Sequence, residues 1–162
     1  MANKEPVKDI FRRMKIRHDA SRTPTGILPL GGIRVVTVLL DWNEPDAEAA
    51  ETAVREFFGK RGCELFILNP GPKDLTCFGR IRKRVRLQDG KSARREELFI
   101  SLASGSTFAE QYEAAASPAK FKVGRSQTLV ESYDFVMSDS PMKRSSQLEI
   151  FEAITEHLQK IK

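Results

Sequence analysis

Residues 33–41 read IRVVTVLLD, and this stretch decides the fold. Almost every residue in it is β-branched or leucine, which is typical of a strand buried on both faces of a parallel sheet. The next segment has a helical pattern, with Asn43 as its predicted N-cap and Pro45 in its first turn. A second apolar strand, CELFIL at residues 63–68, completes a strand–helix–strand unit, whose crossover is almost always right-handed.

The same alternation continues toward the C-terminus. Three further apolar runs, at residues 98–102, 121–124 and 133–137, have the length and composition of short strands. Strands that alternate with helices predict an α/β fold of three layers, Rossmann-like, with a mostly parallel sheet of about five strands and helices on both faces.

Two downstream helices are marked by their first turns. Thr107 with Glu110, and Ser146 with Glu149, have the spacing of a capping box. The residues expected to face inward are Phe108, Tyr112 and Ala115 in the first helix, and Phe151, Ile154, Leu158 and Ile161 in the second.

Residues 73–97 have no clear period. A short strand is predicted at residues 75–78 and an edge strand at 85–87, with a hairpin turn at Asp89 and Gly90. A helix in place of the edge strand is the competing interpretation.

The N-terminal region predicts a separate element. Residues 5–18 form a basic amphipathic helix, and its apolar positions are Val7, Ile10, Phe11 and Met14. Proline and glycine interrupt the sequence that follows. The expected organisation is a helical appendage at 1–22, a linker at 23–32 and a single α/β domain at 33–162.

Composition excludes several classes of protein. With 162 residues and 40% apolar content, the chain is long enough for a real core and too apolar to be disordered. No apolar run is long enough to span a bilayer, and two cysteines exclude a disulfide-dense scaffold. The N-terminal residues lack the apolar stretch of a secretory signal, so a cytoplasmic location is expected.

Positive charge is concentrated in the first part of the chain. Residues 1–95 carry 20 Lys and Arg against 12 Asp and Glu, within a net charge of +5 overall. The tract at residues 80–95 is the densest part, and we expect it to bind a polyanion together with the first helix. RNA or a ribonucleoprotein is the expected partner, and an acidic protein is an alternative; a solvated sheet edge is the plain structural explanation. The candidate polyanion-binding residues are Arg80, Arg82, Lys83, Arg84, Arg86, Arg94 and Arg95.

A second candidate site follows from the expected sheet, because ligands in such folds lie beyond the carboxyl ends of the strands. Asp41 ends the central strand, and a hydroxyl-rich turn formed by Ser104, Gly105, Ser106 and Thr107 precedes a helix. These residues suit a phosphate-bearing small ligand, such as a nucleotide or a sugar phosphate. Ordinary helix capping explains the same turn.

Nothing in the sequence marks a catalytic centre. There is no Walker pattern, GxGxxG, nucleophile elbow or metal-ligand spacing. We therefore expect no catalytic residue, no metal and no cofactor, and a non-catalytic binding role is favoured. The alternative is an enzyme, or a small-ligand-binding or glycosyltransferase-like domain, that recognises a nucleotide or sugar phosphate at the edge formed by Asp41 and residues 104–107. A further alternative is a membrane- or protein-docking adaptor that acts through the apolar face of the first helix.

Three segments resemble a family of short bacterial Rossmann-like proteins of unknown function: LTCFGRIR at 75–82, residues 98–125, and YDFVMSD at 133–139. The most specific segment is AKFKVG at 119–124. The resemblance implies the same fold and carries no activity. The order of elements is also similar to the N-terminal, acceptor-side half of heptosyltransferase-type glycosyltransferases, which need a second domain for the nucleotide-sugar.

Overall fold

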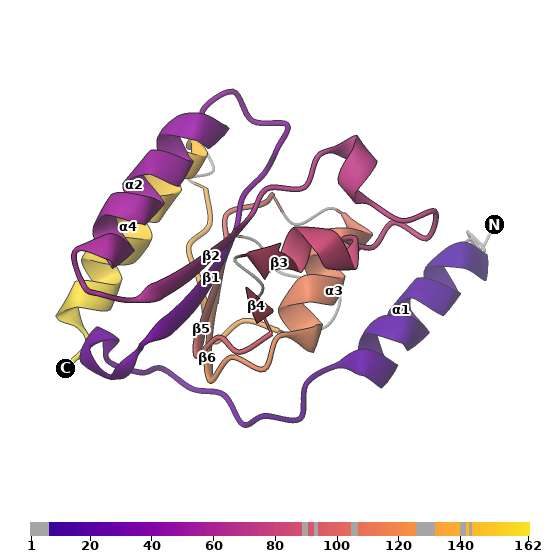
Figure 1. Ribbon diagram of the computed structural model, residues 1–162, viewed down its shortest axis with the longest axis horizontal. Helices are drawn as coiled ribbons and strands as arrows, with labels where there is room; N and C mark the ends of the chain where they lie inside the picture. The colour runs from indigo at the N-terminus through magenta and orange to yellow at the C-terminus, as the bar shows by residue number, and fades with distance from the viewer. Residues whose placement is uncertain are drawn as a thin grey trace.

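A computed structural model describes residues 7–88, 91–92, 94–104, 107–125, 132–139, 142 and 144–162. A parallel sheet of five strands lies at its centre, in the order β2-β1-β5-β6-β7 (Figure 1). Val38 lies in register between Ile67 and Ile100, so the central strand has a neighbour on each side. The strands are β1 (Val35–Leu39), β2 (Glu64–Leu68), β5 (Leu98–Ser101), β6 (Phe121–Gly124) and β7 (Phe135–Val136).

This arrangement confirms the predicted α/β, Rossmann-like fold. The chain adds strands to one side of β1 first and then to the other, which is the doubly wound order. The direction of winding reverses between β1 and β5. In such sheets the crevice at the carboxyl ends of those two strands is the usual place for a ligand.

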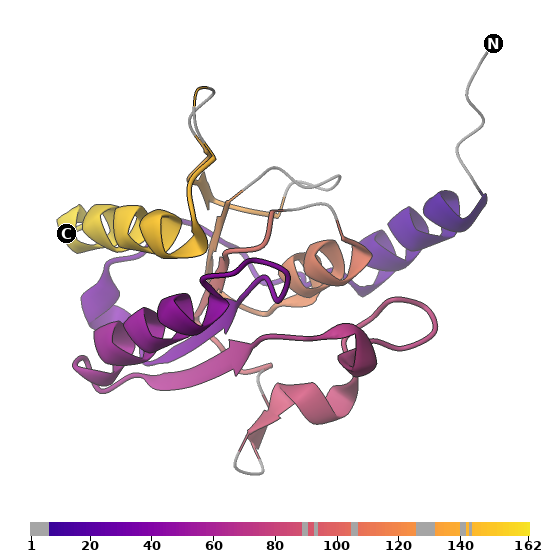
Figure 2. The same cartoon turned by 90° about the horizontal axis from the view of Figure 1, so that it is seen from above.

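Helices cover both faces of the sheet (Figure 2). On one face, α2 (Ala47–Gly59) packs beside α4 (Gln147–Lys160), with the rings of Phe58 and Phe151 6.2 Å apart. The other face is covered by α3 (Phe108–Ala116). The predicted inward stripe of the last helix is confirmed: Phe151, Ile154 and Leu158 are buried in the core, and Ile161 packs against it.

The first helix, α1 (Val7–Asp19), lies outside α3 and packs against it (Figures 1 and 2). Ile16 is buried against Tyr112 and Ala115, and the Tyr112 hydroxyl donates a hydrogen bond to Asp19 at 2.5 Å. The prediction that Phe108, Tyr112 and Ala115 face the core is therefore wrong. These three face α1, while the sheet side of α3 carries Ala109 and Ala114.

The start of α2 also differs from the prediction. Asp46, not Asn43, is the N-cap residue, and Pro45 precedes the helix instead of lying in its first turn. The carboxylate of Asp46 accepts a hydrogen bond from the backbone N–H of Leu148 at 2.8 Å, in the first turn of α4. Asp46 thus ties the two helices together at their N-terminal ends.

The chain between β2 and β5 folds mostly as tight turns. The predicted strand at 75–78 is wrong: only a single bridge joins Leu75 to Ile81, around a turn in which Gly79 has φ +81°. The predicted edge strand is partly helical, because Lys83–Arg86 form the 3-10 helix η3. Asp89 and Gly90 lie outside the described residues. The remaining short elements are η1 (Leu30–Gly32), η2 (Pro72–Asp74), β3 (Leu87–Gln88) and β4 (Lys91–Ser92), the last two forming an antiparallel pair.

Within the described part of the chain, none of the helices combines the length and the apolar character needed to cross a bilayer. The division into 1–22, 23–32 and 33–162 stays a prediction.

Candidate functional site

A cavity of about 430 Å³ opens at the point where the winding of the sheet reverses. We call it the carboxyl-edge cavity. Three of the sequence-predicted ligand residues, Asp41, Ser104 and Thr107, line it, while Gly105 and Ser106 lie outside the described residues. Its other polar lining residues are Trp42, Asn43, Glu44, Glu110 and Arg144.

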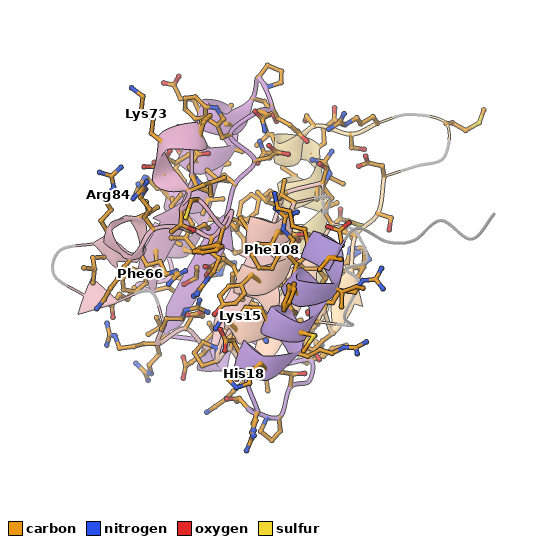
Figure 3. All side chains as sticks on the ribbon, turned by 90° about the vertical axis from the view of Figure 1, so that its right-hand side faces the viewer. Lys15, His18, Phe66, Lys73, Arg84 and Phe108 are labelled. Carbon is orange, nitrogen blue, oxygen red and sulfur yellow. The ribbon has the colours of Figure 1, made fainter. Side chains whose placement is uncertain are left out.

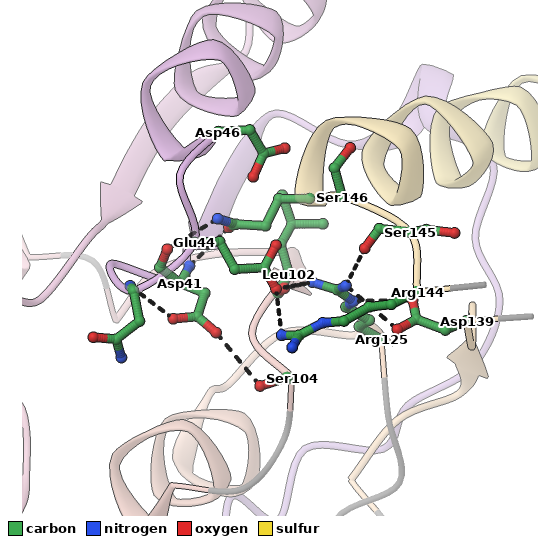
Figure 4. Close-up of polar contacts among 12 residues, drawn as sticks. Asp41, Glu44, Asp46, Leu102, Ser104, Arg125, Asp139, Arg144, Ser145 and Ser146 are labelled. Atoms are coloured by element: carbon green, nitrogen blue, oxygen red, sulfur yellow. Dashed lines mark hydrogen bonds and ion pairs between the residues drawn. The ribbon is translucent and has the colours of Figure 1, made fainter.

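The carboxylate of Asp41 is held by neutral donors (Figure 4). Its Oδ1 accepts from the backbone N–H of Asn43 at 3.0 Å, and its Oδ2 accepts from the Ser104 hydroxyl at 3.4 Å. The buried side chain of Gln147 binds both the N–H and the C=O of Asp41, at 2.8 and 2.9 Å. The first residue of α4 thus fixes the backbone at the end of β1.

Arg125, directly after β6, is a structural residue that the sequence reasoning missed. Its side chain is 2% exposed and binds Glu44 at 2.5 Å and Asp139 at 3.3 Å. It also donates to the carbonyls of Leu102, at 3.2 Å, and Ser145. Figure 4 shows this guanidinium at the centre of segments that follow β1, β5 and β7 and precede α4. Five N–H donors in one planar group make Arg suited to such a junction.

Glu110 departs from the predicted capping box. Thr107 does cap α3, because its side chain accepts from the Glu110 backbone N–H at 3.3 Å. The Glu110 carboxylate does not return to the cap: Oε1 instead accepts from the Ser101 hydroxyl at 3.1 Å and from the Tyr133 hydroxyl. The residue is 2% exposed, and this burial raises the pKa of the Glu110 carboxyl. No described residue makes a hydrogen bond to Oε2.

The position of Tyr133 depends on Gly124. A Cβ atom added to Gly124 would lie 2.3 Å from the Tyr133 ring, well inside van der Waals contact. Only glycine lets the ring lie against β6 and bring its hydroxyl to Glu110.

Trp42 forms an open wall of the carboxyl-edge cavity. Its indole lies against Gly71, where an added Cβ would be 3.6 Å from the ring. The side chain is nevertheless 54% exposed. One part of the aromatic surface is therefore supported by backbone, and the rest remains accessible.

A second hollow lies on the opposite side of the segment at residues 75–81. It consists of two adjoining cavities of about 460 and 590 Å³ that share Phe78 and Arg80, and we call them together the basic groove. The described residues of its lining include no aspartate or glutamate. Its cationic side chains are Lys8, Arg12, Lys15, Arg80, Lys83, Arg86 and Arg94.

The predicted polyanion-binding residues divide between this groove and other surfaces. Arg80, Lys83, Arg86 and Arg94 line the groove. The other three lie outside its lining and make local contacts: Arg82 with the Lys73 carbonyl at 3.2 Å, Arg84 with Asp74 at 3.5 Å and Arg95 with Glu64 at 2.8 Å. The tract is thus not one continuous patch.

Intramolecular partners neutralise part of the groove's charge. Glu113, 2% exposed, binds Arg86 at 2.7 Å and Arg94 at 3.2 Å. On α1, Lys15 pairs with Asp19 at 2.8 Å and Arg12 with Asp9 at 3.7 Å. In the ion pairs of the described residues, the seven cationic side chains therefore meet three carboxylates.

Aromatic rings lie among these cations, which the spacing of the tract alone did not indicate. Arg80 stacks over the Tyr112 ring at 4.1 Å, and Arg12 lies over the Phe108 ring at 5.2 Å. Phe11 and Phe78, from segments far apart in the sequence, line the same cavity and are 65% and 74% exposed. Figure 3 shows Phe108 beside α1, with Lys15 on the same side of the molecule.

The described residues include no cluster of three or more His, Cys, Asp or Glu side chains able to hold a metal ion. Cys77 is exposed at the groove, and Cys63 is half-buried, where burial raises the pKa of its thiol.

Comparisons with known proteins add little to this geometry. No protein-family model matches the chain, and no curated protein matches it significantly. Among solved structures, an exopolyphosphatase-related protein from Bacteroides fragilis is similar, with a TM-score of 0.44 and 14% identity. The alignment covers 96% of this chain and 45% of that one, so this chain spans under half of the other protein's length.

Proposed function

We propose that the protein is a binding module for single-stranded RNA and that the basic groove holds it. The observation that carries this proposal is the shared wall of the two cavities. Phe78 and Arg80 belong to both, so a stackable ring and a cation lie between two adjoining hollows that are lined by further cationic side chains. Binding modules for single strands combine a positive groove with aromatic rings on which bases stack.

Charge supports a phosphate backbone as the ligand. Among the described residues, Lys8, Arg80 and Lys83 have no carboxylate within ion-pair distance, and the groove carries more cations than acids. When a cationic surface binds phosphates, counterions are released. The binding constant therefore falls steeply as the salt concentration rises.

Exposure of the rings supports a single strand over a duplex. Phe11 and Phe78 present most of their surface to solvent. Apolar surface in contact with water is unfavourable, and a base stacked on each ring would cover it. Bases in a duplex are already stacked on one another and cannot use these rings.

The turn that carries Phe78 and Arg80 is built for its position. Gly79 adopts φ +81°, and an added Cβ would contact Arg12 and Phe108 at 3.5 and 3.7 Å. The turn therefore lies directly beside Arg12 of α1 and Phe108 of α3.

The test is fluorescence anisotropy with a labelled 12-nucleotide oligouridylate over a salt series. We expect log K to fall with log salt, with a slope of about −0.7 per phosphate contacted. Phe78→Ala should weaken binding about tenfold, because one stacked base contributes roughly 1–3 kcal/mol. Arg80→Ala should also make the salt slope shallower.

Arg55→Ala is the matched control. Arg55 is an exposed arginine that pairs with Glu51 on α2, on the other face of the sheet, and its loss should leave affinity unchanged. Absence of binding at low salt, or equal weakening by Arg55→Ala and Arg80→Ala, would remove the proposal. Equal affinity for a duplex of the same length would remove the single-strand assignment.

A further inference from the structure

We propose that the carboxyl-edge cavity is a second, independent site and that it binds a small organic ammonium ion. The first reason is an unused buried acceptor. Glu110 is 2% exposed and lines the cavity, yet its Oε2 atom has no hydrogen-bond partner in the described part of the chain. A buried carboxylate oxygen without a donor is costly, and a ligand N–H would satisfy it.

The second reason is the sign of the charge that lines the cavity. Of the three carboxylates in its described lining, Glu44 is already paired, with Arg125 at 2.5 Å and Arg144 at 3.2 Å. The other two, Asp41 and Glu110, receive hydrogen bonds from hydroxyl and backbone N–H groups. Arg144 is the cationic residue of the described lining, and its guanidinium is already in an ion pair with Glu44. The balance favours a cation over the phosphate that the sequence suggested.

The third reason is Trp42. Its indole rests on Gly71 and leaves 54% of the side chain exposed at the cavity. Tryptophan is the best aromatic partner for a cation, and rings of this kind recognise organic ammonium ions. An ammonium has three N–H donors and no acceptor, which matches the unpartnered Oε2 atom of Glu110 and the Asp41 carboxylate, whose present donors are neutral. A volume of about 430 Å³ limits the ligand to a small molecule.

Trp42 also makes the site measurable, because it is the sole tryptophan of the chain. The experiment titrates the full-length protein with benzylammonium chloride and follows tryptophan emission, with benzyl alcohol as the neutral analogue of the same shape. We expect a saturable change with benzylammonium and at least about tenfold weaker binding of the alcohol, a difference of about 1.4 kcal/mol.

Two variants locate the charge. Asp41→Asn and Glu110→Gln should each weaken benzylammonium about tenfold, whereas Glu152→Gln, on the exposed side of α4, should not. Asp41 is half-buried, so its variant keeps the test valid even where Glu110→Gln unfolds the protein. Equal binding of the alcohol, no saturable signal with benzylammonium, or weakening by Glu152→Gln alone overturns the inference. Oligouridylate affinity is measured on the same variants. If the protein binds no oligouridylate, the RNA proposal fails, and the result for benzylammonium stands independently.

Discussion

Glu110 and Glu113 lie one turn apart on α3 and are equally buried, yet they serve opposite sides of the molecule. Glu113 is paired with Arg86 and Arg94, which line the basic groove. Glu110 faces the carboxyl-edge cavity, where hydroxyl groups are its donors and burial raises the pKa of its carboxyl. Ile81, 2% exposed, lines both hollows and separates them.

The difference shows two ways in which this fold makes a site. The cavity is a product of the sheet, because parallel strands bring their following loops to one edge. The groove is a product of the periphery, since one of its two cavities lies where α1 and the turn at Gly79 meet α3, and the other lies along residues 76–94. Loss of one site should therefore leave the other in place.

The largest effect is expected at the cavity, from Arg125→Met. Removing this buried guanidinium leaves Asp139 without its ion pair and frees the loops that it joins, so we expect a loss of about 3 kcal/mol in the free energy of unfolding. Urea denaturation measures it.

Arg144→Met is the control for that substitution. Arg144 binds the same Glu44 but is 68% exposed, and such an ion pair contributes about 1 kcal/mol or less. Similar losses for the two variants would show that burial of Arg125 is not what stabilises this edge.

A smaller and local effect is expected on the groove side, from Ile16→Ala. The change removes the buried contact of α1 with Tyr112 and Ala115 and should weaken docking of α1 by about 2 kcal/mol. Amide hydrogen exchange in α1 should accelerate and oligouridylate affinity should fall, while benzylammonium binding is retained.

Met14→Ala tests whether that effect comes from docking. Met14 is on the same helix and 59% exposed, so its loss should change neither exchange nor docking. Unchanged exchange in Ile16→Ala, or loss of benzylammonium binding in it, would contradict the separation of the two sites.

The smallest expected effect is a pH dependence that only the cavity carries. Because burial raises the pKa of Glu110 above its usual 4.5, the folded state binds a proton at this carboxyl more tightly than the unfolded state does, and the carboxyl ionises at a higher pH than an exposed glutamate. Stability from this group is complete below pH 4.5 and is lost as pH rises, at up to about 1.4 kcal/mol per pH unit. The groups facing the carboxyl are Asp41, Ser101 and Tyr133.

Urea denaturation of the wild type and of Glu110→Gln from pH 4.5 to 7 measures this dependence. As pH rises, the free energy of unfolding of the wild type should fall relative to that of Glu110→Gln. Glu96, whose pKa burial also raises, is present in both proteins and cancels in the difference. A constant difference across this range would contradict the assigned state of Glu110.

The sheet was predictable because its signals are local. An apolar run such as residues 36–40 indicates a strand that is buried on both faces, and all five of these residues are buried. The capping box of Ser146 and Glu149 forms from side chains three residues apart. Asp41, Ser104 and Thr107 were placed at one edge for the same reason, since parallel strands end together.

The remaining features depend on contacts between distant residues. Thr107 and Glu110 have capping spacing, but Tyr133 and Ser101 take the carboxylate from the cap. Phe11 and Phe78 form one hollow only after α1 has docked on α3. The spacing of residues along the chain does not predict such contacts. Glu110 occupies the third helical position, where a capping-box acid normally lies, so its spacing alone indicates the capping role that the structure does not show.

The cover that α1 places over α3 matters for anyone who wants to work with part of this protein. A fragment that starts at residue 33 would keep every strand of the sheet and look complete by sequence. It would also uncover Tyr112 and Ala115 and take Asp19 away from the Tyr112 hydroxyl. An apolar helix face newly open to water favours self-association, so the shorter polypeptide should be harder to keep in solution than the full chain.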